Sequence, residues 1–139
     1  MIRPPGFAGA AFGTARSGDL RVDHVGRASV SAALGIAPDW AFVKQVHGAR
    51  VIEAVTAGDL GEADAIVTYS PGLPIAVATA DCVPVVIESE EAVGVVHAGW
   101  RGAAAGPRMK DEFSSTGTPT TATLSVVFMP HIVSGWGAV

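Results

Sequence analysis

The stretch Ile75-Ala76-Val77-Ala78 decides the fold class, because a strand formed by it would be apolar on both faces. A second stretch, Val93-Gly94-Val95-Val96, has the same property. This pattern is typical of central strands in a sheet that is covered on both sides. The sequence therefore predicts a layered α/β sheet rather than an antiparallel meander with one exposed face.

Short runs rich in valine and isoleucine extend outward from these two stretches and predict further strands. The predicted strands cover residues 41–46, 50–54, 65–68, 73–79, 83–88, 92–97 and 124–129. A turn at Gly48-Ala49 would join the first two of them as a hairpin.

A helix is predicted ahead of these strands, with Asp23 as its N-cap and with Gly35 and Pro38 at its end. The residues that would share one face of this helix are Val25, Ser29, Val30, Ala33 and Leu34. A second helix could begin at residues 102–106, where Pro107 would end or kink it.

The composition indicates one domain over residues 1–139 and excludes several classes of protein. Apolar residues make up 49% of the chain, which is enough for a single buried core. Nine basic and thirteen acidic side chains give a net charge of −4, which argues against a nucleic-acid-binding protein with a broad basic face. Cys82 is the only cysteine, so an intrachain disulfide framework is excluded.

No apolar run reaches the ~20 residues of a membrane span, and residues 1–5 do not resemble a secretory signal. We therefore expect a cytoplasmic protein and no membrane partner.

Three residues with side chains suited to metal binding stand at the ends of predicted strands: His47, Cys82 and His97. Loops at strand ends carry the functional groups of open α/β sheets, so these side chains can converge if the strands lie side by side. Two imidazoles and a thiolate suit zinc, and three protein ligands leave a fourth position for water or substrate. The alternative is that Cys82 is an inert buried thiol and His97 an ordinary core or rim histidine.

Three polar residues nearby are candidates for contact with a substrate. Arg101 stands between two glycines, where its guanidinium and backbone N–H groups would bind phosphate or a carboxylate. Asp81 could act as a general base or orient a ligand, and Gln45 shares a strand face with His47 and could contact a polar substrate group. Each has an ordinary alternative: a surface arginine in a glycine turn, an aspartate that ties down a turn, and a glutamine that faces solvent.

Three segments that contain these residues resemble the signature segments of the laccase-domain (YfiH-like) family. They are Gln45-Val46-His47-Gly48, Ala80-Asp81-Cys82-Val83-Pro84-Val85 and His97-Ala98-Gly99-Trp100-Arg101-Gly102, in the family's order and near its spacing. Ala63-Asp64-Ala65, before a predicted strand, is also similar to the family. The match is strongest over residues 41–106, whereas residues 107–139 diverge.

The resemblance implies a fold and an activity. Members of the family are α/β proteins with mixed sheets between helical layers, akin to a superfamily of cysteine hydrolases. They were first named polyphenol oxidases or laccases. Later they were assigned purine nucleoside phosphorylase activity, with adenosine deaminase and methylthioadenosine phosphorylase activities beside it. Because members are longer than this chain, we expect a truncated C-terminus that lacks part of the substrate pocket and one helical layer, which a homodimer could replace.

Residue by residue, the resemblance implies that zinc is bound by His47, Cys82 and His97. The residues that it places around a purine nucleoside and phosphate are Gln45, Asp81 and Arg101. Zinc is expected rather than copper, because a multicopper oxidase needs many imidazoles and this chain has four histidines. Three other interpretations stay open: an inactive truncated relative, a copper-dependent polyphenol oxidase, and a cysteine hydrolase with Cys82 as its nucleophile.

Overall fold

The computed structural model describes residues 1–7, 9–99, 101 and 125–128, which form a mixed α/β fold with two β-sheets. Its elements in chain order are β1 (Ala10–Phe12), the 3-10 helix η1 (Ala15–Ser17), α1 (His24–Leu34), β2 (Ala41–Lys44), β3 (Val51–Glu53), β4 (Gly58–Glu62), β5 (Ala65–Thr68), β6 (Ile75–Ala78), β7 (Val83–Glu88), β8 (Val93–Ala98) and β9 (Ser125–Phe128). The predicted α/β class is confirmed.

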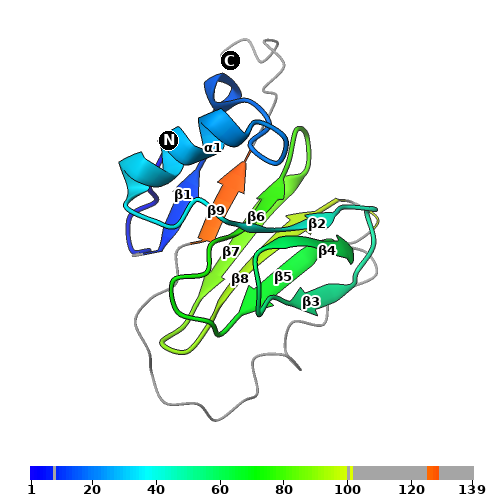
Figure 1. The fold of residues 1–139 in the computed structure, drawn as a ribbon. Coiled ribbons are helices and arrows are strands. Elements are labelled where there is room, and N and C mark those ends of the chain that lie inside the picture. The colour runs from blue at the N-terminus through cyan, green and yellow to red at the C-terminus, as the bar shows by residue number, and fades with distance from the viewer. Residues whose placement is uncertain (8, 100, 102–124, 129–139) are drawn as a thin grey trace.

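The two sheets differ in strand direction (Figure 1). The five-stranded sheet has the order β1-β9-β6-β2-β4, and each neighbouring pair in it is parallel. The four-stranded sheet has the order β3-β5-β8-β7, in which β3 and β5 are parallel and the other two pairings are antiparallel. The strands of the predicted mixed α/β fold are divided between two sheets, because strands that are close in sequence alternate between them.

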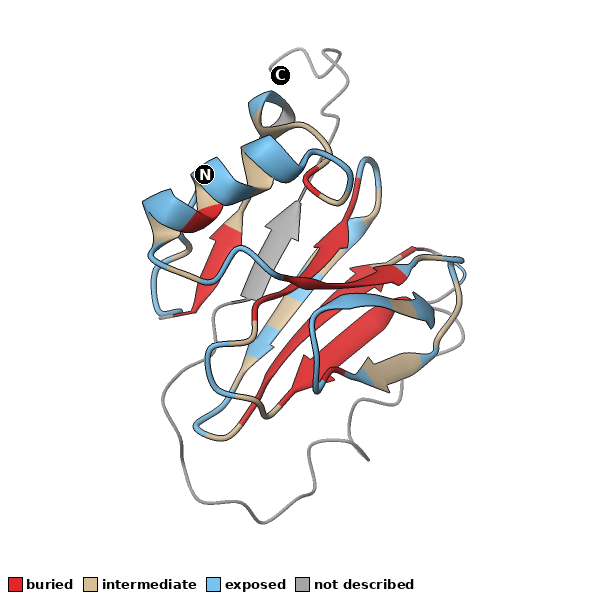
Figure 2. Cartoon of the chain, viewed as in Figure 1, coloured by how far each residue is buried: buried red, intermediate tan, exposed pale blue. Residues whose placement is uncertain are grey.

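The five-stranded sheet lies between α1 and the four-stranded sheet. On one face, Phe42 and Ala76 form a cluster with Val30 and Leu34 of α1. On the other face, Ile75 packs in a cluster that includes Ile66 and Val95 of the four-stranded sheet. Figure 2 shows that the buried residues concentrate on the central strands. Both β6 and β8 are buried along almost their whole length, as their two apolar faces predict.

The ends of α1 agree with the prediction, but its buried face does not. Asp23 accepts a hydrogen bond from the N–H of Gly26 at 2.9 Å, and Gly35 ends the helix in a left-handed conformation with φ 72°. Val30 and Leu34 pack against the sheet, whereas Val25 is 82% exposed and Ser29 and Ala33 are also exposed. Ser31 is buried on the sheet-facing side of α1. A polar side chain is tolerated there because its hydroxyl accepts a hydrogen bond from the indole of Trp40 at 3.0 Å.

All seven predicted strands are present, with ends that differ by two residues at most. The hairpin predicted at Gly48-Ala49 is wrong, because β2 and β3 belong to different sheets. Two strands were not predicted: the short β1, and β4, whose sequence Gly58-Asp59-Leu60-Gly61-Glu62 has the glycines and acidic residues of a turn. The helix predicted at residues 102–106 lies outside the described residues.

Within the described part of the chain, no helix combines the length and the apolar character that crossing a bilayer requires.

Candidate metal centre

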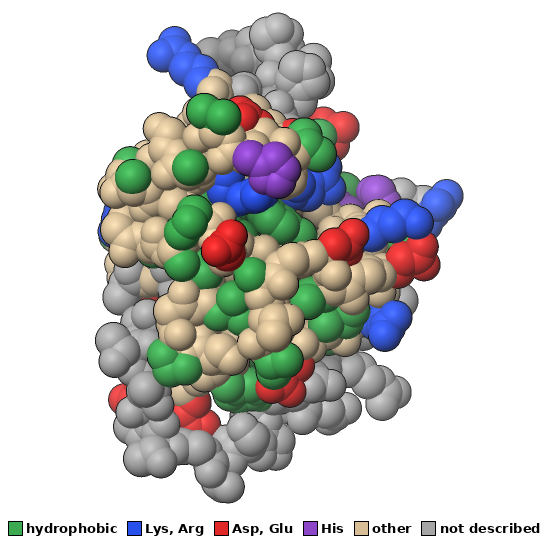
Figure 3. Space-filling model, viewed as in Figure 1, with side chains coloured by type: hydrophobic (Ala, Val, Ile, Leu, Met, Phe, Trp, Pro, Cys, Tyr) green, Lys and Arg blue, Asp and Glu red, His purple; other side chains and the backbone are tan. Residues whose placement is uncertain are grey.

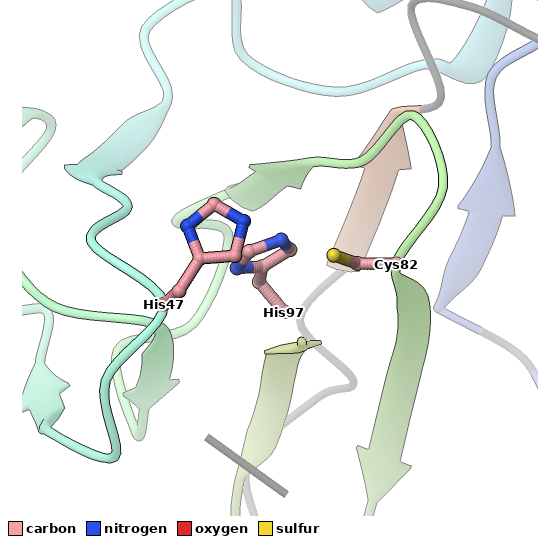
Figure 4. Close-up of side chains that lie close together, drawn as sticks. All are labelled: His47, Cys82 and His97. Atoms are coloured by element: carbon pink, nitrogen blue, oxygen red, sulfur yellow. The ribbon is translucent and has the colours of Figure 1, made fainter. Parts of the chain in front are cut away.

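Three side chains from separate parts of the sequence meet at one point (Figure 4). His47, Cys82 and His97 each offer one ligand atom, and these atoms all lie within 4.8 Å of one another. The two imidazole rings have centroids 4.7 Å apart and are nearly perpendicular, with an interplanar angle of 81°. His97 is buried, Cys82 is partly buried and His47 is exposed, so the group opens to solvent on one side. The predicted convergence of these residues therefore exists in the fold.

The fold brings these residues together at the carboxyl ends of two neighbouring parallel strands. His47 follows β2, and Cys82 follows β6 and immediately precedes β7. His97 reaches the same point from β8 of the other sheet, where it pairs with Pro84 of β7. In open α/β sheets, ligands bind outside the carboxyl ends of the strands, and this site follows that rule.

Asp64, for which the sequence suggested no role, is hydrogen-bonded to two of these three residues. Its carboxylate accepts hydrogen bonds from the backbone N–H groups of Val46, His47 and Gly48 at 3.2, 2.9 and 2.7 Å. A fourth hydrogen bond joins it to Nδ1 of His97 at 2.8 Å. The backbone carbonyl of Asp64 also accepts from the N–H of His97 at 2.7 Å.

The environment of Asp64 stabilises its charged form. Burial by itself would raise the pKa of the Asp64 carboxyl. The hydrogen bonds from His97 and from the three backbone N–H groups favour the carboxylate, and the net result is a pKa below the usual value. A fixed negative charge therefore lies against the imidazole of His97.

Two backbone features let the side chains approach this closely. His47 has a positive φ of 59°, and among the described residues other than glycine it alone has one. Gly99 leaves room for the cluster, since a Cβ atom at this position would lie 3.0 Å from Cδ2 of His47 and 3.5 Å from Sγ of Cys82. The donor set, the short separations and this space all fit a bound transition-metal ion.

Replacing Gly99 with alanine is expected to weaken the binding of an added zinc ion by about tenfold, because metal affinity depends on how each ligand side chain is oriented. The new methyl group would push the His47 ring away by a few tenths of an ångström. Zinc titration with a competing chelator measures the effect, and thermal unfolding of the metal-free protein checks that the fold is intact. Unchanged zinc affinity in a folded G99A protein would contradict this account of Gly99.

The three predicted substrate residues occupy different surroundings. A pocket of about 310 Å³ beside the cluster is lined by Gln45 and Asp81, among others. The side chain of Gln45 is hydrogen-bonded to the backbone of Ala78, with Nε2 donating at 2.6 Å and Oε1 accepting at 2.8 Å. Asp81 is exposed at the pocket rim. Arg101 is exposed three residues after β8 and is not among the lining residues, whereas Arg21, which the sequence did not suggest, is one of them.

A larger cleft of about 730 Å³ lies beside α1, and Arg21 lines both this cleft and the pocket of about 310 Å³. Basic side chains and a histidine gather on this face in Figure 3. Their hydrogen bonds serve the fold: Arg27 donates to the carbonyls of Leu20 and Arg21, and Arg21 binds the carboxylate of Asp19 at 2.7 Å. The hydrogen bond from Arg21 lowers the pKa of Asp19, although burial opposes it. The smaller pocket is the one that His47, Cys82 and His97 line.

Comparison with known proteins identifies the family. The model of the multi-copper polyphenol oxidoreductase laccase family matches residues 7–135. The chain belongs to this family.

Relatives in the laccase family carry a different functional name. A Deinococcus radiodurans protein named purine nucleoside phosphorylase is 46% identical over 90 residues, which are 63% of this chain and 35% of that protein. A Haemophilus influenzae protein with the same name is 35% identical over 112 residues, covering 66% of this chain and 46% of the relative. The crystal structure of Neisseria meningitidis protein NMB0706, of family DUF152, has a TM-score of 0.52 and 36% identity, covering 61% of this chain and 36% of that one. The chain thus spans between a third and a half of the length of these relatives.

Proposed function

We propose that this member of the laccase family is a zinc-dependent purine nucleoside phosphorylase. The observation that carries the proposal is the cluster of His47, Cys82 and His97, which would hold the ion. The names of the Deinococcus and Haemophilus relatives support the choice of reaction. Zinc bound here would supply Lewis acidity beside the substrate, with one coordination position left open.

The number of histidines favours zinc over the copper of the family's name. A laccase needs several copper ions and therefore many imidazoles, whereas the sequence has four histidines. Within the described residues, one group of three or more metal-ligating side chains is present. A thiolate that acts as a ligand must stay reduced, so we also propose a cytoplasmic location.

The proposed reaction transfers a ribosyl group from a purine to inorganic phosphate. The N-glycosidic bond breaks with its electron pair going to the purine nitrogen, and a phosphate oxygen forms the new bond to the anomeric carbon. The departing purine takes up a proton that comes from dihydrogen phosphate or water, and Asp81 at the pocket rim is the group that we assign to relaying it. Gln45 holds the Ala78 backbone of the pocket wall in place, and the second N–H of its amide would be available to a polar group of the nucleoside.

The test is incubation of the zinc-loaded chain with adenosine, inosine or methylthioadenosine, with and without phosphate. Release of free base that depends on phosphate, together with a sugar phosphate, supports the proposal. Conversion of adenosine to inosine would add the deaminase activity. Absence of base release from folded, zinc-loaded protein would overturn the proposal, and oxidation of a phenol by copper-loaded protein would favour the laccase reaction instead.

Replacing Arg101 with alanine is expected to raise the KM for phosphate by at least about tenfold. Although Arg101 does not line the pocket, we assign its guanidinium to phosphate because it belongs to the family-like segment that begins at His97, and a charge-assisted hydrogen bond of this kind contributes about 1.5–3 kcal/mol. Arg50→Ala is the matched control, because Arg50 is also exposed and donates to the carbonyl of Glu62, away from the pocket. Equal KM values for phosphate in the two variants would remove Arg101 from the site.

A further inference from the structure

We propose that Asp64 is a positioning residue that fixes the ring nitrogen with which His97 faces the metal pocket and fixes the backbone that carries His47. The inference deepens the proposed zinc site but needs no phosphorylase activity to be true. It goes beyond the three candidate ligands because Asp64 is not a member of their cluster and its carboxylate is engaged by four hydrogen bonds.

The hydrogen bond from Asp64 sets which nitrogen of the His97 ring carries the proton. Oδ1 of Asp64 lies 2.8 Å from Nδ1 of His97, and both residues are almost fully buried, with exposed fractions of 1% and 4%. The Asp64 carboxylate already accepts hydrogen bonds from three backbone N–H groups, and an ionised carboxylate can only accept hydrogen bonds. Nδ1 must therefore carry the hydrogen, and Nε2 keeps its lone pair for a metal ion.

Asp64 also stabilises the left-handed backbone conformation of His47. A left-handed conformation is unfavourable for a residue with a Cβ atom, at a cost of about 1 kcal/mol or more. Three consecutive N–H groups, from Val46 to Gly48, converge on the Asp64 carboxylate and compensate for this cost. Such a concave arrangement of N–H groups favours a negative charge. One side chain therefore holds both histidine segments before any ion binds.

Substitution of Asp64 with asparagine would disturb this arrangement in a specific way. Oδ1 accepts from His47 N–H and His97 Nδ1, and Oδ2 accepts from Val46 and Gly48 N–H. An amide replaces one of these oxygens with an NH₂ group, so two donors lose their acceptor whichever way the amide turns. If the NH₂ group faces His97, the imidazole must move its proton to Nε2, the position that a metal would need.

The experiment measures two quantities in the full chain, neither of which is enzymatic activity. Two-bond ¹H–¹⁵N correlation spectra of metal-free protein, at a pH well above the ordinary imidazole pKa of ~6.5, report which ring nitrogen carries the proton. The His97 signals are identified by their loss in a His97→Gln variant. We expect the Nδ1–H form in the wild type, a shift toward the Nε2–H form in Asp64→Asn, and zinc affinity that falls by about 10- to 100-fold in that variant.

Glu62→Gln is the matched control. It makes the same carboxylate-to-amide change on an exposed side chain that pairs with Lys44 at 2.8 Å, and it should leave the ring proton and the zinc affinity unchanged. A folded D64N protein with wild-type zinc affinity and an Nδ1–H ring would overturn the proposal. Should D64N fail to fold, the wild-type spectrum decides, because a proton found on Nε2 of His97 contradicts the proposed role directly. If both measurements agree with expectation and no nucleoside is cleaved, the proposed function fails and the role of Asp64 stands.

Discussion

Replacing Cys82 with serine is expected to abolish stoichiometric zinc binding and to lower phosphorolysis by at least about 100-fold. The two side chains have nearly the same shape, but a thiol gives up its proton when it coordinates a metal ion whereas a serine hydroxyl does not do so readily, so the cluster would lose its charged ligand. Metal analysis of the purified variant and the rate of base release measure the two effects. Full activity in metal-free C82S protein would refute the metal site.

The fold of this variant is checked by its response to zinc. An ion that binds only the native state raises the unfolding temperature of the wild type, and the increase should be absent in C82S. Val83→Ala is a suitable control, because Val83 is the next residue, is 62% exposed and offers no ligand atom. If Cys82 were instead the nucleophile of a hydrolase, C82S would lose activity and an electrophile would label the thiol of the metal-free wild type.

Replacing Ile75 with alanine is expected to lower the free energy of unfolding by about 2–5 kcal/mol. Ile75 is fully buried between the two sheets, so its loss leaves a cavity that neighbouring strands cannot readily fill. Such a loss is a large share of the ~5–15 kcal/mol stability of a small domain. Urea unfolding of the wild type and the variant measures it.

Ile87→Ala is the control for this core substitution. Ile87 lies on β7 at the edge of the four-stranded sheet and is 36% exposed, so its truncation should cost about 1 kcal/mol or less. Equal losses for Ile75 and Ile87 would contradict the assignment of the core to the space between the sheets.

The central strands were predictable because their sequences carry the signal of burial on both faces. Ile75 and Val77 face the four-stranded sheet, and Ala76 and Ala78 face α1. Every side chain of β6 therefore packs in a hydrophobic cluster. No such signal exists for β4, which pairs with β2 at a sheet edge through its backbone. Pairing at an edge places few demands on side chains, which is why glycine and acidic residues are tolerated there.

The wrong hairpin has a specific physical reason. Gly48 and its neighbours have the composition of a turn, but their N–H groups bind the carboxylate of Asp64 and do not close a two-residue loop between paired strands. The edge of β2 where a hairpin partner would pair is taken by β4 in parallel register. Local sequence shows that the chain turns, whereas the identity of the next partner depends on contacts far along the chain.

The convergence of His47, Cys82 and His97 was predictable from their positions at strand ends, but the contact of Asp64 with His97 was not. The proximity of Asp64 to His97 follows from the antiparallel register of β5 and β8, in which Ala65 lies opposite Val96. Register is set by the packing of whole strands, so a contact across 33 residues leaves no local pattern in the sequence. The usable signal was the motif Ala63-Asp64-Ala65, in which a charged residue stands between two small apolar ones.

The separate attachment of the thiol has a consequence for the kinetics of the site. Both imidazole segments are fixed to one carboxylate, whereas Cys82 stands at the beginning of β7, which among the described strands of its sheet is hydrogen-bonded to β8 alone. Fraying of that strand end would carry the sulfur away from the histidines while leaving them in place. The rate at which a bound ion exchanges with solvent would then be limited by this local opening, and exchange would not require the domain to unfold.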